Sequence, residues 1–217
     1  MPDSVSTNVK KELRRQLKTQ WEKLKSNPTF WLTLQAQINQ QCLKFLTSLP
    51  LGACRNKFWG AYVAMDDEVS LQGLLDHKDS VKGNLQAEWK WAFPRIQDLG
   101  GMDFWQPQDP SNESNWECHS WGLQQPRIEQ SQRVLATEMA GVFVPGLGFD
   151  QRGYRLGRGK GFYDRYFQTE GAEIPYKVGI CPEECLLESV DGTWMDSWDQ
   201  KLQWVITEKR IIDCRKK

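Results

Sequence analysis

The chain has 217 residues, 28 basic and 28 acidic side chains, and 39% apolar residues that include 11 tryptophans. This composition suits a packed core and excludes wholesale disorder. A net charge of zero gives no general attraction to nucleic acid or to an anionic membrane, so we expect neither as a partner. No apolar run is long enough to cross a bilayer, and residues 1–11 lack the apolar stretch of a secretory signal, which predicts a cytoplasmic protein.

The six cysteines do not have the density of a disulfide scaffold. Cys181 and Cys185 flank three residues, and Cys118 adjoins His119, but neither spacing is that of a zinc ribbon or finger. We therefore expect reduced, partly buried thiols rather than a structural zinc site.

Two helices are predicted at the start of the chain. The first follows the capping residues Ser6, Thr7 and Asn8 and has an apolar stripe at helical spacing: Val9, Leu13, Leu17, Trp21 and Leu24. Lys10, Arg14 and Lys18 share another face, which on its own is most simply a solvated surface. The second helix is expected over residues 29–49, with its buried stripe formed by Phe30, Leu34, Ile38, Cys42 and Phe45.

Strands and helices alternate in the rest of the chain. Strands are expected over residues 58–64, 88–93 (closed by Pro94), 138–144, 176–180 and 204–207, and helices over residues 70–76 and 161–167. Residues 100–126 are rich in turn formers and have no period, which predicts a long surface excursion. The alternation predicts an α/β fold with a mostly parallel central sheet, in one domain over residues 1–217.

Residues 144–164, VPGLGFDQRGYRLGRGKGFYD, are the most informative part of the sequence. Six of the 17 glycines lie between residues 146 and 161. Glycine allows positive φ and close approach, so several main-chain N–H groups can contact one anion. The basic side chains of the segment suit phosphate oxygens: Arg152, Arg155, Arg158, Lys160 and Arg165. The segment joins a predicted strand to a predicted helix, where ligands of α/β sheets collect.

Neither G-x-x-x-x-G-K-[ST] nor G-x-G-x-x-G occurs here, which disfavours a P-loop and a standard NAD-binding unit. A flexible surface turn is the plainer alternative to an anion-binding loop. A linker, however, needs none of the bulky residues that interleave these glycines: Phe149, Tyr154, Leu156, Phe162, Tyr163 and Tyr166. Asp164 then follows, either as a magnesium ligand beside bound phosphates or as a helix-start carboxylate that interacts with the helix dipole or pairs with Arg165.

The run from Pro145 to Asp164 closely resembles the 5-formyltetrahydrofolate cyclo-ligase (5,10-methenyltetrahydrofolate synthetase) family. The resemblance extends along nearly the whole chain, through KKELR (10–14), YVAMDDE (62–68), FPR (93–95), WGLQQP (121–126) and Asp199 ahead of WVITE (204–208). It implies a Rossmann-related three-layer fold. It also implies conversion of 5-formyltetrahydrofolate to 5,10-methenyltetrahydrofolate, using ATP and Mg²⁺ and releasing ADP and phosphate.

The resemblance implies a role for each residue that matches a family motif. ATP would contact Lys10, Lys11, Arg14, Arg155, Leu156, Gly157, Arg158, Gly159, Lys160, Gly161, Phe162 and Tyr163, with Arg155, Arg158 and Lys160 as the catalytic cations. The folate would contact Val63, Glu68, Arg158, Gly159, Lys160, Gly161 and Phe162, and Asp164 and Asp199 would hold Mg²⁺. The chain departs from the pattern at Phe162, where the family often has Tyr, and at Trp198, where many relatives have His.

The implied chemistry runs through a phosphorylated formyl intermediate and needs positioning and charge neutralisation rather than a protein nucleophile. Glu68 is suited to hold the donor-rich edge of a pterin, although the residues alone allow it to be one more acid in an exposed turn. Two other functions stay open: a phosphotransferase acting on another small acceptor, and a non-catalytic protein that binds folate or nucleotide. We expect a monomer.

Overall fold

The computed structural model describes residues 4–50, 53, 57–76, 89–97, 100–188 and 194–216. Its main sheet has the strand order β13 (Ile211–Asp213), β12 (Trp204–Ile206), β10 (Tyr176–Ile180), β7 (Met139–Pro145), β1 (Lys57–Gly60), β2 (Trp89–Ile96), β3 (Met102–Pro107) and β6 (Ser131–Val134). The strands from β12 to β2 pair in parallel, and antiparallel strands complete both edges. The predicted α/β class with a mostly parallel central sheet is therefore confirmed.

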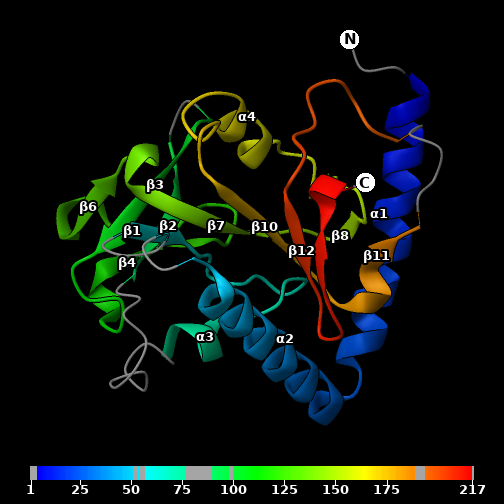
Figure 1. Cartoon of the computed structure of the whole chain (residues 1–217), viewed down its shortest axis with the longest axis horizontal. Coiled ribbons are helices and arrows are strands. Elements are labelled where there is room, and N and C mark those ends of the chain that lie inside the picture. Colours follow the sequence, from blue (N-terminus) through cyan, green and yellow to red (C-terminus); the bar gives the residue numbers. More distant parts are fainter. Residues whose placement is uncertain are drawn as a thin grey trace.

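Helices lie on both sides of this sheet (Figure 1). α2 (Pro28–Ser48) and α3 (Gln72–Asp76) lie on one side, and α4 (Phe162–Gln168) lies on the other. α1 (Ser4–Lys25) runs along one end of the molecule beside β8 (Gly148–Asp150) and β11 (Leu186–Leu187), and it begins before the capping residues that the sequence indicates. No helix of the described ranges is both long and apolar enough to span a membrane.

The start of α2 follows the rules of helix capping. Asn27 accepts a hydrogen bond from the Phe30 N–H at 3.0 Å, and Pro28 takes the first helical position, where its missing N–H costs nothing. The predicted stripe is buried except at Phe30, whose side chain is 47% exposed. Trp31 makes the inward contact of this turn instead, packing edge-on against Trp21 at 5.6 Å.

The core is organised around Trp59, which is fully buried on β1. Its ring lies 5.1 Å from that of Phe143 and is stacked at 6.0 Å on that of Tyr176. A Cβ at position 141 would lie 2.5 Å from the Trp59 ring, so Gly141 on β7 makes room for it. Phe45 of α2 then packs edge-on against Trp59 at 6.3 Å, which fixes this helix to the sheet.

Two predicted strand ends are wrong. β1 ends at Gly60 rather than at residue 64, and the chain leaves the sheet after Ala61, whose N–H donates to the Ala92 carbonyl at 2.8 Å. β2 continues through Pro94 to Ile96. The parallel register with β1 stops at Ala92, so the missing N–H of Pro94 leaves no β1 partner unpaired, and β2 goes on in antiparallel pairing with β3. The predicted start at residue 88 lies outside the described ranges.

The prediction of a surface excursion over residues 100–126 is also wrong. This stretch contains β3, with Met102 and Phe104 buried, and a hairpin of β4 (Trp116–Cys118) and β5 (Gln124–Pro126). Asp103 is buried as well, because Gln97 donates to it and Arg133 pairs with it at 2.9 Å. Because this buried position is occupied by a carboxylate that is satisfied by distant partners, the hydropathy pattern of the segment does not indicate a buried strand.

Candidate active site

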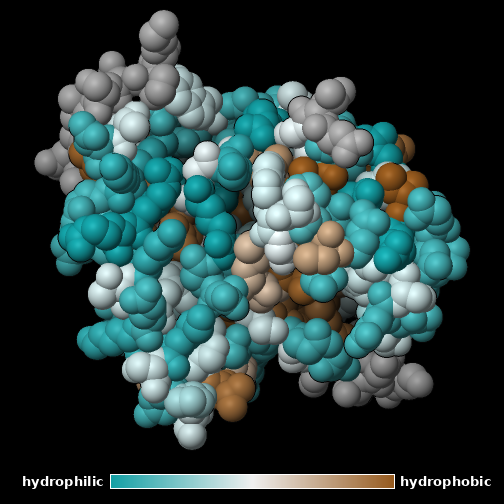
Figure 2. Space-filling view, turned by 180° about the vertical axis from the view of Figure 1, so that it is seen from behind, coloured by the Kyte–Doolittle hydropathy of each residue, from teal (hydrophilic) through white to brown (hydrophobic). Residues whose placement is uncertain are grey.

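A cavity of about 550 Å³ lies where α1, residues 62–68, the β4–β5 hairpin and the segment after β9 (Arg155–Leu156) meet. Nearly every residue assigned by resemblance lines it: Lys10, Arg14, Val63, Glu68, Arg155, Leu156, Gly157, Arg158, Gly159, Lys160, Gly161, Phe162, Tyr163, Asp164 and Asp199. Lys11 lies outside this lining with an exposed side chain. The face opposite that of Figure 1 is hollowed, with apolar side chains visible in the recess and hydrophilic ones around it (Figure 2).

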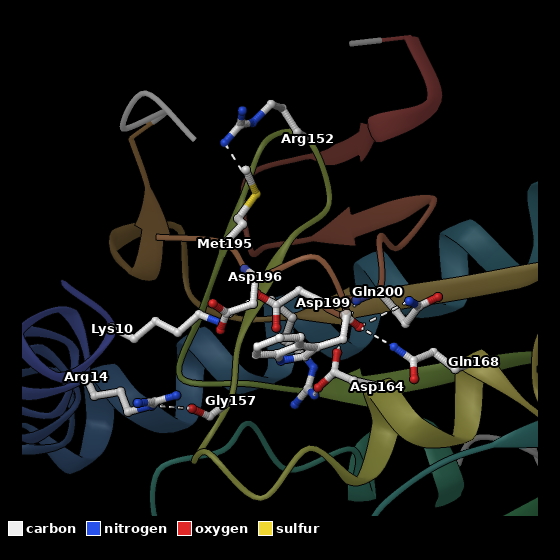
Figure 3. A network of polar contacts seen from close by, with 12 residues as sticks. Lys10, Arg14, Arg152, Gly157, Asp164, Gln168, Met195, Asp196, Asp199 and Gln200 are labelled. Carbon is white, nitrogen blue, oxygen red and sulfur yellow. Dashed lines mark hydrogen bonds and ion pairs between the residues drawn. The ribbon is translucent and has the colours of Figure 1, made fainter. Parts of the chain in front are cut away.

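α1 is fastened to the start of the glycine segment. The Trp21 indole N–H donates to the Leu147 carbonyl at 2.8 Å, in a buried contact. Leu17 packs beside Gly148, where an added Cβ would lie 2.8 Å from a Leu17 methyl carbon. This contact points Lys10 and Arg14, one helical turn apart, toward the cavity (Figure 3). Lys10 is buried rather than solvated, whereas Lys18 on the same face is exposed.

Lys10 connects the helix to the turn before β12. Its ammonium nitrogen lies 2.6 Å from Oδ2 of Asp196 and 2.6 Å from Oδ2 of Asp199. The Asp196 N–H also donates to Oδ2 of Asp199 at 2.8 Å, so the two acids belong to one structured turn. The sequence prediction missed Asp196, although its position three residues before Asp199, in the spacing of a tight turn, is a usable signal.

Arg155 occupies the centre of the cationic side. Its guanidinium pairs with Oδ2 of Asp164 at 2.8 Å and lies 5.3 Å from the centre of the Tyr163 ring. Asp164 therefore pairs with Arg155 and not with Arg165, which donates to the carbonyls of Lys160 and Gly100 instead. Arg152 lies outside the cavity lining and points away in Figure 3, with its side chain on Asp150 and on the Met195 sulfur.

The loop from Gly157 to Gly161 takes a shape that glycine permits. Gly159 and Gly161 have φ values of +92° and +67°, in the left-handed region that other residues enter at a cost. Arg14 Nε donates to the Gly157 carbonyl at 3.0 Å, which ties the loop to α1. The Lys160 ammonium lies 4.6 Å from the centre of the Trp121 ring. Residues 157–161 of this loop line the same cavity as Arg14 and Arg155.

Glu68 faces the cavity from the segment after β1. Its side chain is only 12% exposed, which excludes the exposed-turn alternative. Burial raises the pKa of this carboxyl to about 7, against the opposing effects of the Met65 N–H, which donates to it at 2.9 Å, and of the Arg155 charge. Arg158 approaches the same segment, forming an ion pair with Asp67 and lying 3.7 Å from Glu68.

The wall around Glu68 is mostly apolar. It is lined by Tyr62, Val63, Met65, Pro94, Ile96, Met102 and Leu123. The cations on one side suit a polyanion, whereas an apolar wall beside the buried Glu68 carboxylate suits a flat heterocycle that carries N–H donors. Among the described residues, no three His, Cys, Asp or Glu side chains converge as a metal cage. A magnesium ion that keeps waters and phosphate ligands needs only one or two carboxylates, and Asp164 and Asp199 fit that requirement.

Comparisons with known proteins agree with this arrangement. The probable 5-formyltetrahydrofolate cyclo-ligase of Schizosaccharomyces pombe is 36% identical over 43% of this chain and 50% of its own length. The Mus musculus 5-formyltetrahydrofolate cyclo-ligase is 37% identical over 41% of this chain and 45% of its own, so these two alignments span about half of each relative. The alignment with the probable 5-formyltetrahydrofolate cyclo-ligase of Caenorhabditis elegans, 25% identical, covers 96% of this chain and 97% of that relative.

Solved structures show the same fold. The 5,10-methenyltetrahydrofolate synthetase of Aquifex aeolicus matches with a TM-score of 0.70 and 24% identity, covering 95% of this chain and 93% of that one. The Mycoplasma pneumoniae 5,10-methenyltetrahydrofolate synthetase matches with a TM-score of 0.67 and 20% identity, covering 92% and 98%. Residues 6–208 match the family pattern itself. The chain belongs to the 5-formyltetrahydrofolate cyclo-ligase family.

Proposed function

We propose that this chain catalyses the ATP-dependent cyclisation of 5-formyltetrahydrofolate to 5,10-methenyltetrahydrofolate, with release of ADP and phosphate. Membership of the family supports ATP and this folate as substrates. One observation carries the proposal: a single cavity sets the cationic loop and Arg14 against a buried carboxylate, Glu68, in an apolar wall. Both reactants therefore have a matching surface within one cavity.

The cationic side is the proposed site of the ATP phosphates. Arg14 and Arg155 already lie beside the loop, and Lys10 reaches the same region from α1. The exposed Lys160 is free of carboxylate contacts in the described residues and rests on an aromatic face, so it can turn toward a phosphate without breaking an ion pair. Arg155, Arg158 and Lys160 are the cations assigned to the transferred phosphoryl group.

The side around Glu68 is the proposed site of the reduced pterin. A carboxylate there can accept two hydrogen bonds from the donor-rich edge of the ring, and its desolvated position strengthens both. Phe162 lines the same cavity and offers a flat apolar face, and Val63 adds a partly exposed apolar contact. Binding the folate here would direct its formyl group toward the loop.

The proposed reaction uses these residues for positioning and charge neutralisation. The formyl oxygen attacks the γ-phosphorus while the bond to ADP breaks, which leaves the formyl oxygen phosphorylated and its carbon joined to N5 as an iminium. N10 then adds to that carbon and loses its proton, and the carbon–oxygen bond to phosphate breaks. No step requires a protein nucleophile, because each new bond forms between substrate atoms.

Magnesium is proposed to be held by Asp164 and Asp199 together with the ATP phosphates. When bound, it would neutralise charge on the transferred group. In the present structure Asp164 pairs with Arg155 and Asp199 with Lys10, so a metal on these two carboxylates would leave Arg155 available for phosphate, while Lys10 would keep its ion pair with Asp196. One domain over residues 1–217 is also proposed, since the core includes residues from Leu17 to Cys214. The monomeric state and cytoplasmic location stay predictions.

The decisive test is to incubate the protein with 5-formyltetrahydrofolate, ATP and Mg²⁺ and to follow the absorbance of the methenyl product. We expect product only when ATP and the metal are both present. ADP release with other small acceptors, without methenyl product, would favour a phosphotransferase. Binding of ATP and folate without any turnover would favour a non-catalytic binding protein.

A further inference from the structure

Two large aromatic side chains are exposed at the cavity, and they differ in what they contact. Trp121, 47% exposed, already has neighbours: the Phe162 ring at 5.6 Å, the His119 ring at 5.0 Å and the Lys160 ammonium at 4.6 Å. Trp198 also lines the cavity and is 41% exposed. In the described part of the chain, its indole has neither an aromatic nor a cationic partner. One face of a large flat ring is thus left for a ligand.

The main chain beneath this indole is held firmly. Residues 196–199 form a tight turn in which the Asp199 N–H donates to the Asp196 carbonyl at 3.1 Å. The Trp198 carbonyl accepts hydrogen bonds from the side-chain amides of Gln168 at 2.7 Å and Gln200 at 3.2 Å. The main chain that carries the indole therefore needs little ordering when a ligand binds, which favours binding.

The turn that carries Trp198 also carries Asp196 and Asp199, the two carboxylates that pair with Lys10. Asp199, the next residue, holds Lys10 at 2.6 Å, and the following main-chain N–H, that of Gln200, donates to Asp164 at 3.3 Å. Trp121, by contrast, is grouped with Phe162 and the β4–β5 hairpin. A molecule whose phosphates lie between Arg14 and Arg155 would therefore extend its remaining part along the turn of Trp198.

We propose that Trp198 binds the base of ATP by stacking, an assignment that rests on the proposed function and adds the residue that recognises the nucleotide's planar end. Stacking suits this position because every nucleobase has a π face and an indole offers a large one. The phosphates would then be held by charge and the base by a flat contact that does not depend on charge.

The test is to measure binding of ATP and of inorganic tripolyphosphate, each with Mg²⁺, by calorimetry. For Trp198→Ala we expect ATP to bind roughly 5- to 150-fold more weakly, the usual range for loss of one base–aromatic stack, and tripolyphosphate to bind as in the unaltered protein. Trp198→Phe, which keeps an aromatic face, should recover most of the loss. Phe30→Ala, which removes a similarly exposed aromatic outside the cavity, should change neither.

Kinetics provides a second measurement. Trp198→Ala should raise KM for ATP while leaving kcat at saturating ATP and KM for 5-formyltetrahydrofolate nearly unchanged. Unaltered ATP affinity in Trp198→Ala would overturn the proposal, as would an equal loss of ATP and tripolyphosphate binding or a rise confined to the folate KM. Failure of the unaltered protein to bind ATP at all would instead reject the proposed function.

Discussion

The two sides of the cavity are built in opposite ways. On the cationic side Arg155 and Lys10 lie in ion pairs, and Lys160 is exposed beside an aromatic ring. On the other side the carboxylate of Glu68 is buried next to apolar residues, and burial raises its pKa. On the first side, cations that now pair with carboxylates of the protein can pair with phosphates instead. On the second side, the Glu68 carboxylate is already removed from water before a ligand binds. Charge exchange would govern nucleotide binding and prior desolvation would govern folate binding.

Among the substitutions considered for the cationic side, removal of a loop cation should lower turnover the most. Lys160→Ala is expected to lower kcat about 10²- to 10³-fold, the usual cost of losing one donor to transition-state charge. The fold should persist, because the Lys160 side chain is exposed and its ammonium rests only on the Trp121 ring. Methenyl formation and thermal unfolding measure the two effects. Lys18→Ala, an exposed lysine of α1 outside the cavity, is the control, and normal turnover by folded Lys160→Ala would remove this residue from the mechanism.

The buried carboxylate should give the second side a pH signature. Burial raises the pKa of Glu68 from 4.5 to about 7, so between these values the folded protein binds more protons than the unfolded chain. The free energy of unfolding should therefore decrease as pH rises from about 4.5 to 7, by roughly 2–3 kcal/mol from this group.

Glu68→Gln should remove that decrease, because an amide does not ionise. Denaturant unfolding across this pH range, for the variant and for Glu22→Gln on the exposed face of α1, measures the difference. Parallel pH curves for Glu68→Gln and the unaltered protein would contradict the raised pKa.

Charge exchange on the first side predicts a change in metal dependence. Asp199→Asn should raise the Mg²⁺ concentration required for half-maximal turnover about tenfold at fixed ATP, because a carboxylate ligand is replaced by a neutral amide. Asp213→Asn provides the control, since Asp213 pairs with Arg215 and lies outside the cavity. Identical Mg²⁺ curves for the two variants would argue against Asp199 as a ligand.

A smaller effect should come from the shape of the loop. Gly159→Ala places a Cβ 3.5 Å from an Arg14 guanidinium nitrogen at a φ of +92° and should cost about 1 kcal/mol of stability and several-fold in ATP affinity. Gly100→Ala has a similar φ, +83°, with nothing within 4 Å, so it should cost the same stability and no affinity. Equal ATP affinity in both variants would show that the loop tolerates side chains there.

The regular part of the fold could be predicted from the sequence because its residues carry strong local patterns. The strand over residues 176–180 was predicted with its observed bounds, and β7 was located within a residue of its ends. β3 was missed since Asp103, Gln106 and Pro107 give it a polar, broken pattern, and its burial depends on distant partners such as Arg133. Tertiary contacts, not local preference, place such a strand.

The candidate site was predicted in part, and mostly by resemblance. Residue chemistry indicates the loop after β7 as an anion-binding site. The pairing of Lys10 with Asp196 and Asp199, however, joins residues that are 186 and 189 positions apart in the sequence, and no local sequence pattern can predict such a contact. The glycines of this segment also differ in what they do, which the sequence alone does not show. Gly159 and Gly161 shape the loop at the cavity, whereas Gly148 lies outside its lining and makes room for Leu17.

Trp21 and Leu17, neither of which lines the cavity, fix α1 to the segment at Leu147 and Gly148. Arg14 lies two helical turns, roughly 10 Å, from Trp21, so a small change of tilt at the fixed point displaces its guanidinium. Substitutions at Leu17 or Gly148, neither of which lines the cavity, would therefore present as losses of nucleotide affinity. A natural variant in this helix can therefore weaken nucleotide binding even when the altered residue lies far from the ligand.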